Sequence, residues 1–90
     1  MKLSENMYKQ PLNRRIMKKT SGTLSNNLVV LRAARRLSQK QVAEMLGVSR
    51  QTIVALEANK YNPSLKLAFE IATLFGKRID EIFYYSKGDD

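Results

Sequence analysis

The sequence predicts an all-α protein, a compact five-helix domain that follows a basic N-terminal extension. Three observations favour this fold class. From residue 24 onward the apolar residues recur at helical spacing and show no strand-like alternation. Each expected junction carries residues that start or stop helices. The chain has 90 residues, which suffices for one modest hydrophobic core, so we expect one domain at residues 24–90 behind a flexible basic arm at residues 1–23.

The first two expected helices begin behind polar residues that cap helices well. One is expected at residues 27–36, with Ser25 or Asn26 as its cap. The other follows Ser38, which forms a capping box with the glutamine three positions later, so that each side chain satisfies a free backbone amide of the other residue. Gly47 ends this second helix, because glycine adopts left-handed backbone without a Cβ clash.

The third expected helix begins after the cap Ser49 and runs to about Ala58. Ile53, Leu56 and Glu57 fall on one face at the i, i+3, i+4 spacing, and this face is expected to point inward. The residues left on the outer face are Arg50, Gln51, Val54 and Ala55.

A fourth helix is expected from Ser64 to Gly76, and a last one at residues 79–84. The polar positions of the fourth helix form one narrow stripe, which predicts a central helix that is covered on most sides. The last helix carries Asp80 and Glu81 in its first turn, where the helix dipole favours negative charge. The stripe on the fourth helix consists of Lys66, Glu70, Thr73 and Lys77.

Composition argues against several classes of function. The chain contains no Cys and no His, which removes disulfides, thiol catalysis, the usual zinc ligands and the imidazole base. We therefore expect a protein that is not an enzyme, with no metal, cofactor or small-molecule ligand. No apolar run approaches the roughly 20 residues of a membrane span, so we expect a cytoplasmic protein. Sixteen Lys and Arg against eight Asp and Glu give a net charge of +8, which favours a polyanionic partner such as nucleic acid.

Residues 39–58 have the spacing of two short helices that cross over a tight turn. Such a crossing needs a small residue, and its turn needs a residue that accepts left-handed backbone, and Ala43 and Gly47 meet these demands. In this segment the chain resembles the Xre family of helix-turn-helix regulators, which includes the phage Cro and repressor DNA-binding domains. The resemblance covers about residues 27–85 and is carried by Leu37-Ser38-Gln39, Val42-Ala43, Leu46 to Ile53, Leu56-Glu57, Asn62 to Leu65, Leu67-Ala68 and Ile71-Ala72.

This resemblance, to the small stand-alone bacterial members above all, implies a lambda-repressor-like domain of five helices. It implies that the chain binds double-stranded DNA as a sequence-specific transcriptional regulator, with repression as the expected action. Two other interpretations of the same fold stay open: a protein-interaction adaptor that docks onto a partner, and an antitoxin-type module. The outward positions of Arg50 and Gln51 favour the regulator.

Three places depart from the family pattern. Arg36 stands where a glycine commonly ends the first helix, so the turn there must be built differently or carry mild strain. Ala58 and Asn59 stand where the family often has a polar residue and a glycine. Asparagine tolerates the left-handed turn, but the alanine offers no side-chain bond to a phosphate. Arg78 replaces the usual serine cap of the last helix, which predicts an end that frays.

A recognition helix reads base edges in the major groove with the outward side chains near its N-terminus. Arg50 is expected to bind O6 and N7 of guanine with its planar fork, and Gln51 to bind N6 and N7 of adenine. Thr52 adds a phosphate bond or a methyl contact, and Val54 adds an apolar contact to a thymine methyl. These four residues are the candidates for base readout.

Contacts to the DNA backbone are expected from helix N-termini and turns, whose free amides and polar caps suit phosphate oxygens. Gln39, at the start of the second helix, is the first candidate, and the resemblance implies the same role. The serines among the candidates have an alternative role as helix caps alone. The other candidates are Lys40, Ser49, Lys60, Tyr61, Asn62 and Ser64.

Glu57 is the only acid of the third helix and lies on its inward face, so we interpret it as structural. An inward carboxylate needs a charged hydrogen-bonding partner. Arg32 is the expected partner, because the family pairs these two positions.

Phe83, Tyr84 and Tyr85 place more aromatic surface at the C-terminal end than the closing of a small core needs. This surplus predicts a homodimer that forms through the C-terminal region. In the alternative interpretation Phe83 closes the core and the two tyrosines flank it.

The positive charge is spread unevenly along the chain. Residues 1–31 carry +5, residues 32–66 carry +5 and residues 67–90 carry −2. A basic arm and a basic reading face are thus set against a slightly acidic C-terminal end, which is expected to point away from DNA.

Overall fold

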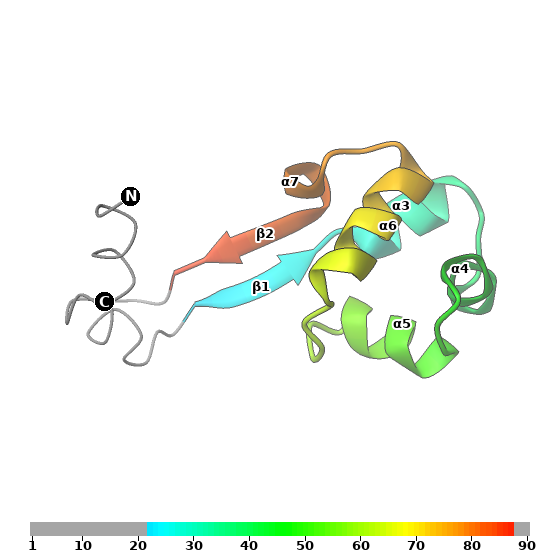
Figure 1. Ribbon diagram of the computed structural model, residues 1–90, viewed down its shortest axis with the longest axis horizontal. Coiled ribbons are helices and arrows are strands. Elements are labelled where there is room, and N and C mark those ends of the chain that lie inside the picture. The colour runs from blue at the N-terminus through cyan, green and yellow to red at the C-terminus, as the bar shows by residue number, and fades with distance from the viewer. Residues whose placement is uncertain (1–21, 88–90) are drawn as a thin grey trace, which may run out of the picture.

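The computed structural model describes residues 22–87, so the arm expected at residues 1–23 lies outside the described residues except for Gly22 and Thr23. The helices form a body at one end, and two paired strands extend from it (Figure 1). In chain order the elements are β1 (Thr23–Asn26), α3 (Leu28–Ala34), α4 (Gln39–Leu46), α5 (Arg50–Glu57), α6 (Leu65–Phe75), α7 (Ile79–Ile82) and β2 (Phe83–Ser86).

The expectation of a purely all-α fold is wrong, because the two ends of the described chain pair as a small antiparallel sheet. β1 lies beside β2, and Asn26 stands opposite Phe83. The last helix, expected to include Tyr84, stops at Ile82. Aromatic side chains favour strands, so Phe83 and the two tyrosines after it leave the helix and pair with the segment before α3. A mostly helical fold is confirmed, but the expectation of five helices is wrong: residues 22–87 hold four helices of seven to eleven residues, and the fifth is reduced to the single four-residue turn α7 because the chain after it forms β2.

α3 begins at Leu28 with Asn27 in the N-cap position, so the expectation of Ser25 or Asn26 as the cap is wrong, and the helix also ends early. Ser25 and Asn26 both belong to β1, and Asn26 Oδ1 accepts from the N–H of Leu28 over 3.0 Å where the strand passes into the helix. The helix ends at Ala34, two residues before the expected end. Arg36 has a φ of 55°, in the left-handed region that glycine occupies easily. The turn expected to carry mild strain is therefore built with an arginine in left-handed backbone.

The expected caps of α4, α5 and α6 are confirmed. Ser38 Oγ accepts from the N–H of Gln41 over 3.0 Å and Gln41 Oε1 accepts from the N–H of Ser38 over 2.8 Å, as a capping box requires. The hydroxyls of Ser49 and Ser64 each accept from the backbone N–H three residues later, over 3.1 Å. α4 ends at Gly47, which has a left-handed φ of 71°.

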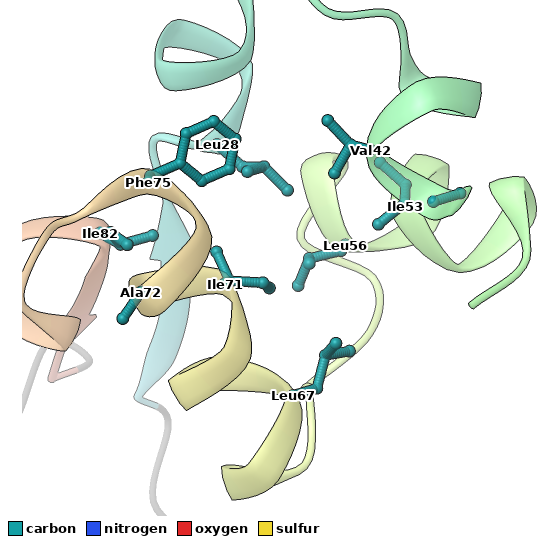
Figure 2. Close-up of a cluster of buried hydrophobic side chains, with 10 residues drawn as sticks. Leu28, Val42, Ile53, Leu56, Leu67, Ile71, Ala72, Phe75 and Ile82 are labelled. Carbon is teal, nitrogen blue, oxygen red and sulfur yellow. The ribbon is translucent and has the colours of Figure 1, made fainter. Parts of the chain in front are cut away.

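One hydrophobic core joins all of these helices (Figure 2). Ile53 and Leu56 are buried in it, as their helical spacing predicts. Each large aliphatic or aromatic side chain in such a core contributes about 1.5–3 kcal/mol. The inner face of α5 is therefore fixed, and its outer face is presented away from the core. The other buried members include Leu28, Val42, Ala43, Leu67, Ile71, Ala72, Phe75 and Ile82.

α6 is not covered on most sides, contrary to the expectation. Leu65 and Phe69 are 72% and 56% exposed, and Met45 of α4 is 56% exposed. Met45 and Phe69 line a surface hollow of about 600 Å³. The described elements are few and short, so they cover one face of α6 and leave the other open. No helix among residues 22–87 is long and apolar enough to cross a membrane.

Candidate nucleic-acid interface

α4 and α5 form the tight helix pair that the spacing predicts. They lie side by side and are joined by a short turn (Figure 1). Gly47 turns the chain out of α4, and the N–H of Val48 donates to the carbonyl of Ala43 over 3.0 Å. Ala43 is buried, in agreement with the need for a small residue where the two helices approach. This short turn holds the start of α5 close to the end of α4.

The outer face of α5 carries three of the four candidates for base readout in exposed positions. Arg50, Gln51 and Val54 are exposed. Thr52 is half-buried and turned toward the cap, because its Oγ1 lies 2.9 Å from Ser49 Oγ. Ala55, expected on the outer face, is also half-buried. The side chains available to a partner are thus concentrated at the start of the helix.

The candidates for backbone contacts lie at both ends of α5. Gln39 and Lys40 belong to the first turn of α4, and Gln39 Oε1 lies 3.4 Å from Arg50 Nη2. The segment between α5 and α6 supplies the candidates at the other end. Gln39 is half-buried and all the others are exposed, namely Lys40, Ser49, Lys60, Tyr61, Asn62 and Ser64.

The chain leaves α5 through Asn59, which has the expected left-handed φ, at 59°. Asn26 Nδ2 donates to the carbonyl of Leu56 over 2.9 Å and lies 3.4 Å from Asn59 Oδ1. These bonds attach β1 to the end of α5 that precedes the loop with the backbone candidates. No sequence pattern signals this link, because the paired residues are 30 or more positions apart.

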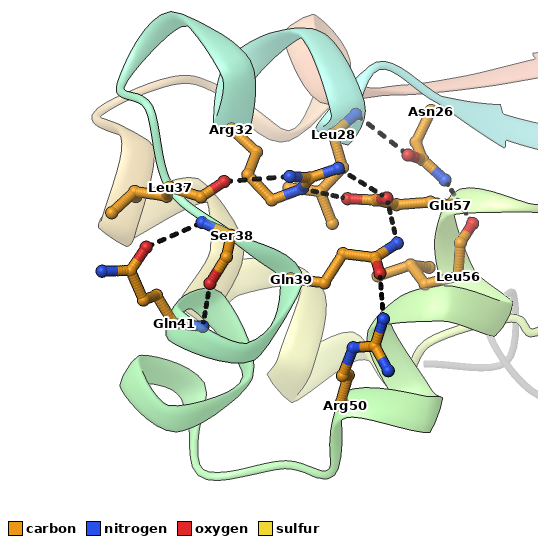
Figure 3. A network of polar contacts seen from close by, with 10 residues as sticks. All are labelled: Asn26, Leu28, Arg32, Leu37, Ser38, Gln39, Gln41, Arg50, Leu56 and Glu57. Atoms are coloured by element: carbon orange, nitrogen blue, oxygen red, sulfur yellow. Dashed lines mark hydrogen bonds and ion pairs between the residues drawn. The ribbon is translucent and has the colours of Figure 1, made fainter.

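Arg32 and Glu57 form the expected ion pair (Figure 3). Arg32 Nε donates to Glu57 Oε2 over 2.8 Å and Arg32 Nη2 donates to Glu57 Oε1 over 3.1 Å. The Arg32 side chain is 18% exposed and that of Glu57 only 6%. The pKa of Arg32 is raised, chiefly by its hydrogen bond to Glu57, against the lowering effect of burial. Arg32 is therefore a permanent cation.

Glu57 accepts from a further donor. Gln39 Nε2 donates to Glu57 Oε1 over 2.9 Å. Polar contacts thus run from Arg32 through Glu57 and Gln39 to Arg50 (Figure 3). The Gln39 amide, expected to face a phosphate, uses one N–H here and has a second to donate. The contact could not be predicted from the sequence, because Gln39 and Glu57 lie on different helices and 18 positions apart.

The part of the chain that contains α4 and α5 is similar to known proteins. The profile of the helix-turn-helix family matches residues 30–82. The chain is 55% identical over 62 residues to an uncharacterized HTH-type transcriptional regulator of Methanocaldococcus jannaschii. The matched segment covers 69% of this chain and 94% of that protein. It is 32% identical over 60 residues to the immunity repressor protein of Bacillus phage phi105, over 67% of this chain and 42% of that repressor. A crystallised protein from Bacteroides fragilis aligns with a TM-score of 0.62 at 26% identity, over 69% of this chain and 100% of that one.

Proposed function

The chain belongs to the helix-turn-helix family, and from this premise we propose that it is a sequence-specific regulator of transcription that binds double-stranded DNA and acts as a repressor. The relative in phage phi105 bears the name of a repressor, which supports this direction of control. One observation carries the proposal. Arg50 and Gln51 are exposed at the start of α5, while the inner face of the same helix holds the core. For such a role we expect no catalysis and a location in the cytoplasm, where the DNA is.

α5 reads the major groove in this proposal. The Arg50 fork matches O6 and N7 of guanine, and the Gln51 amide matches N6 and N7 of adenine. Each such pair contributes roughly 1–3 kcal/mol of discrimination against a wrong base. Val54, one turn later on the exposed face, contacts a thymine methyl.

Phosphate contacts on both sides of α5 set the register of the helix on DNA. At the start of α4, the second N–H of Gln39 and the charge of Lys40 bind phosphates of one DNA strand. The loop beyond α5 binds phosphates of the other DNA strand through Lys60, Tyr61 and Asn62. Ser49 and Ser64 already bind backbone amides as caps, so their hydroxyls reach a phosphate only as an additional bond.

Selection of preferred sites from random duplexes, followed by sequencing, tests this function. We expect the protein to enrich one defined sequence, with guanine and adenine at positions reached by the start of α5. Binding that is salt-sensitive but blind to sequence would contradict the proposal, since phosphate contacts alone give such behaviour.

We also propose that the protein acts as a homodimer formed through its C-terminal strand. Tyr84 and Tyr85 are exposed on β2, and the outer edge of β2 has no partner strand within residues 22–87. Phe83 is half-buried against the core, so the tyrosines and the strand edge supply the surface. A two-fold pair matches DNA sites with two symmetric half-sites in successive major grooves, about 34 Å apart.

A further inference from the structure

The amide of Gln39 lies between a carboxylate and a guanidinium, and this fixes the way it points. A carboxylate only accepts hydrogen bonds and a guanidinium only donates them. Gln39 Nε2 lies 2.9 Å from Glu57 Oε1, and Gln39 Oε1 lies 3.4 Å from Arg50 Nη2 (Figure 3). The reversed amide would set oxygen against oxygen and N–H against N–H. Glu57 therefore selects the orientation in which Gln39 offers an acceptor to Arg50.

Glu57 is itself held in place. Arg32 binds both of its oxygens and also donates from Nη1 to the carbonyl of Leu37 over 2.9 Å. Ile53 and Leu56, on the same face of α5, are buried in the core. The contacts thus begin on a rigid part of the molecule and end on an exposed side chain.

Arg50 gains from this support because its side chain is long and exposed. A free arginine samples many rotamers and loses that freedom when it binds a base. One contact at Nη2 restricts the guanidinium and leaves its other N–H groups free to face a base.

We propose that Glu57 is a positioning residue for base readout, which through Gln39 holds Arg50 in place before DNA arrives. A buried ion pair that never touches DNA thereby helps to set the base preference. This role rests on the proposed function as a DNA-binding regulator. Preorganisation lowers the cost of the contact that the held side chain makes, so the effect is confined to the base pair of Arg50.

A purely structural Glu57 would behave differently. Its loss would lower stability, and with it the affinity for all sequences alike. Two substitutions separate the roles. Gln39→Met removes both amide contacts at a half-exposed site and leaves the Arg32–Glu57 pair intact. Arg32→Lys weakens the ion pair and the fold but keeps a charged Glu57 beside Gln39.

The test compares dissociation constants for the selected site and for the same site with one base pair changed. The base pair of Arg50 is the one at which the Arg50→Ala protein no longer distinguishes the two duplexes. There we expect Gln39→Met and Glu57→Gln to lower discrimination about threefold to tenfold. Both variants should keep full discrimination at the base pair of Gln51. Arg32→Lys should lower Tm and leave discrimination unchanged.

Unchanged discrimination in Gln39→Met or in a folded Glu57→Gln overturns the positioning role. So does an equal loss at every base pair. If Glu57→Gln does not fold, the Gln39 side-chain amide of the unaltered protein is followed by NMR. Slow exchange of its N–H protons with solvent supports the contact, and the fast exchange of a free glutamine overturns it. A protein that selects no site at all contradicts the proposed function itself, before any variant is compared.

Discussion

Glu57 accepts hydrogen bonds from Arg32 and Gln39 on a side chain that is almost fully buried. A charge in such a place costs free energy unless a partner compensates it, and removal of one partner leaves the other without compensation. The pair therefore matters to stability as well as to the reading face.

Glu57→Ala is expected to lower the free energy of unfolding by about 3 kcal/mol or more, because Arg32 would remain mostly buried without its partner. Urea unfolding followed by circular dichroism measures this loss. The matched control is Glu44→Ala, which removes an exposed acid of α4 and should change stability by no more than about 0.5 kcal/mol. If the two substitutions lowered the free energy of unfolding equally, the ion pair would not contribute to stability.

Substitutions of Arg50 and of Lys60 should affect DNA binding in different ways, since we assign Arg50 to a base contact and Lys60 to a phosphate contact. Lys60→Ala is expected to weaken binding to all duplexes alike and to reduce the salt slope of the binding constant by about 1. Arg50→Ala is expected to lose roughly 1–3 kcal/mol of discrimination at one base pair. Fluorescence anisotropy titrations at several salt concentrations separate the two effects. A changed base preference in Lys60→Ala would refute the assignment of this lysine to the backbone.

At the scale of the elements, the turn after α3 stores strain. Arg36 has left-handed backbone, which costs a residue with a Cβ roughly 1–2 kcal/mol. Arg36→Gly is therefore expected to raise the free energy of unfolding by about 0.5–1 kcal/mol after the extra chain entropy of glycine. Ala34→Gly, at the exposed end of the helix itself, should instead lower it by up to about 1 kcal/mol. Thermal or urea unfolding of both variants checks the opposite signs, and a loss of stability in Arg36→Gly would refute the strain.

The helix-turn-helix elements could be predicted from the sequence because their boundaries depend on neighbours along the chain. Ser38, Gly47 and Ser49 each act on backbone groups within four residues. The start of α7 could not be predicted from the residue type at its cap, Arg78, alone. Its N–H donates to Glu81 Oε1 over 2.8 Å, so the acid three positions later closes the end that was expected to fray.

The strand pair and the polar network could not be predicted, because both depend on residues far apart in the chain. Asn26 and Phe83 are register partners across nearly the whole described sequence. The aromatic residues after α7 are compatible with a continued helix as well as with a strand. They form a strand because they pair with β1. The Gln39–Glu57 bond likewise depends on how α4 crosses α5, which sequence spacing does not specify to within hydrogen-bond distance.

For the whole molecule, we expect the basic N-terminal segment to add positive charge to DNA binding and no preference for a particular sequence. Residues 1–21 hold six Lys and Arg and one acid, and β1 begins only at Thr23. Deletion of residues 1–21 is expected to lower the affinity for DNA and flatten its salt dependence while the selected site stays the same. Binding titrations across salt concentrations measure both quantities. A changed site preference would assign base contacts to this segment.

The proposed dimer also belongs to this scale, and two faces with similar exposed aromatic side chains allow a matched comparison. Tyr85 on β2 is 60% exposed and Phe69 on α6 is 56% exposed. We expect Tyr85→Ser to weaken self-association and Phe69→Ser to leave it unchanged, as measured by analytical ultracentrifugation at micromolar concentration. Dissociation by Phe69→Ser alone would place the interface on α6, and a single species of 10.3 kDa in the unaltered protein would exclude a stable dimer.

The central claim is that the exposed start of α5 reads DNA sequence, and parallel site selection with the unaltered protein, Arg50→Ala and Gln51→Ala tests it most directly. The unaltered protein should enrich one site with two symmetric half-sites. Each variant should lose the preference at a single, different position of each half-site and keep the rest. Enrichment of an identical site by all three proteins, or of no site by the unaltered protein, would contradict the claim.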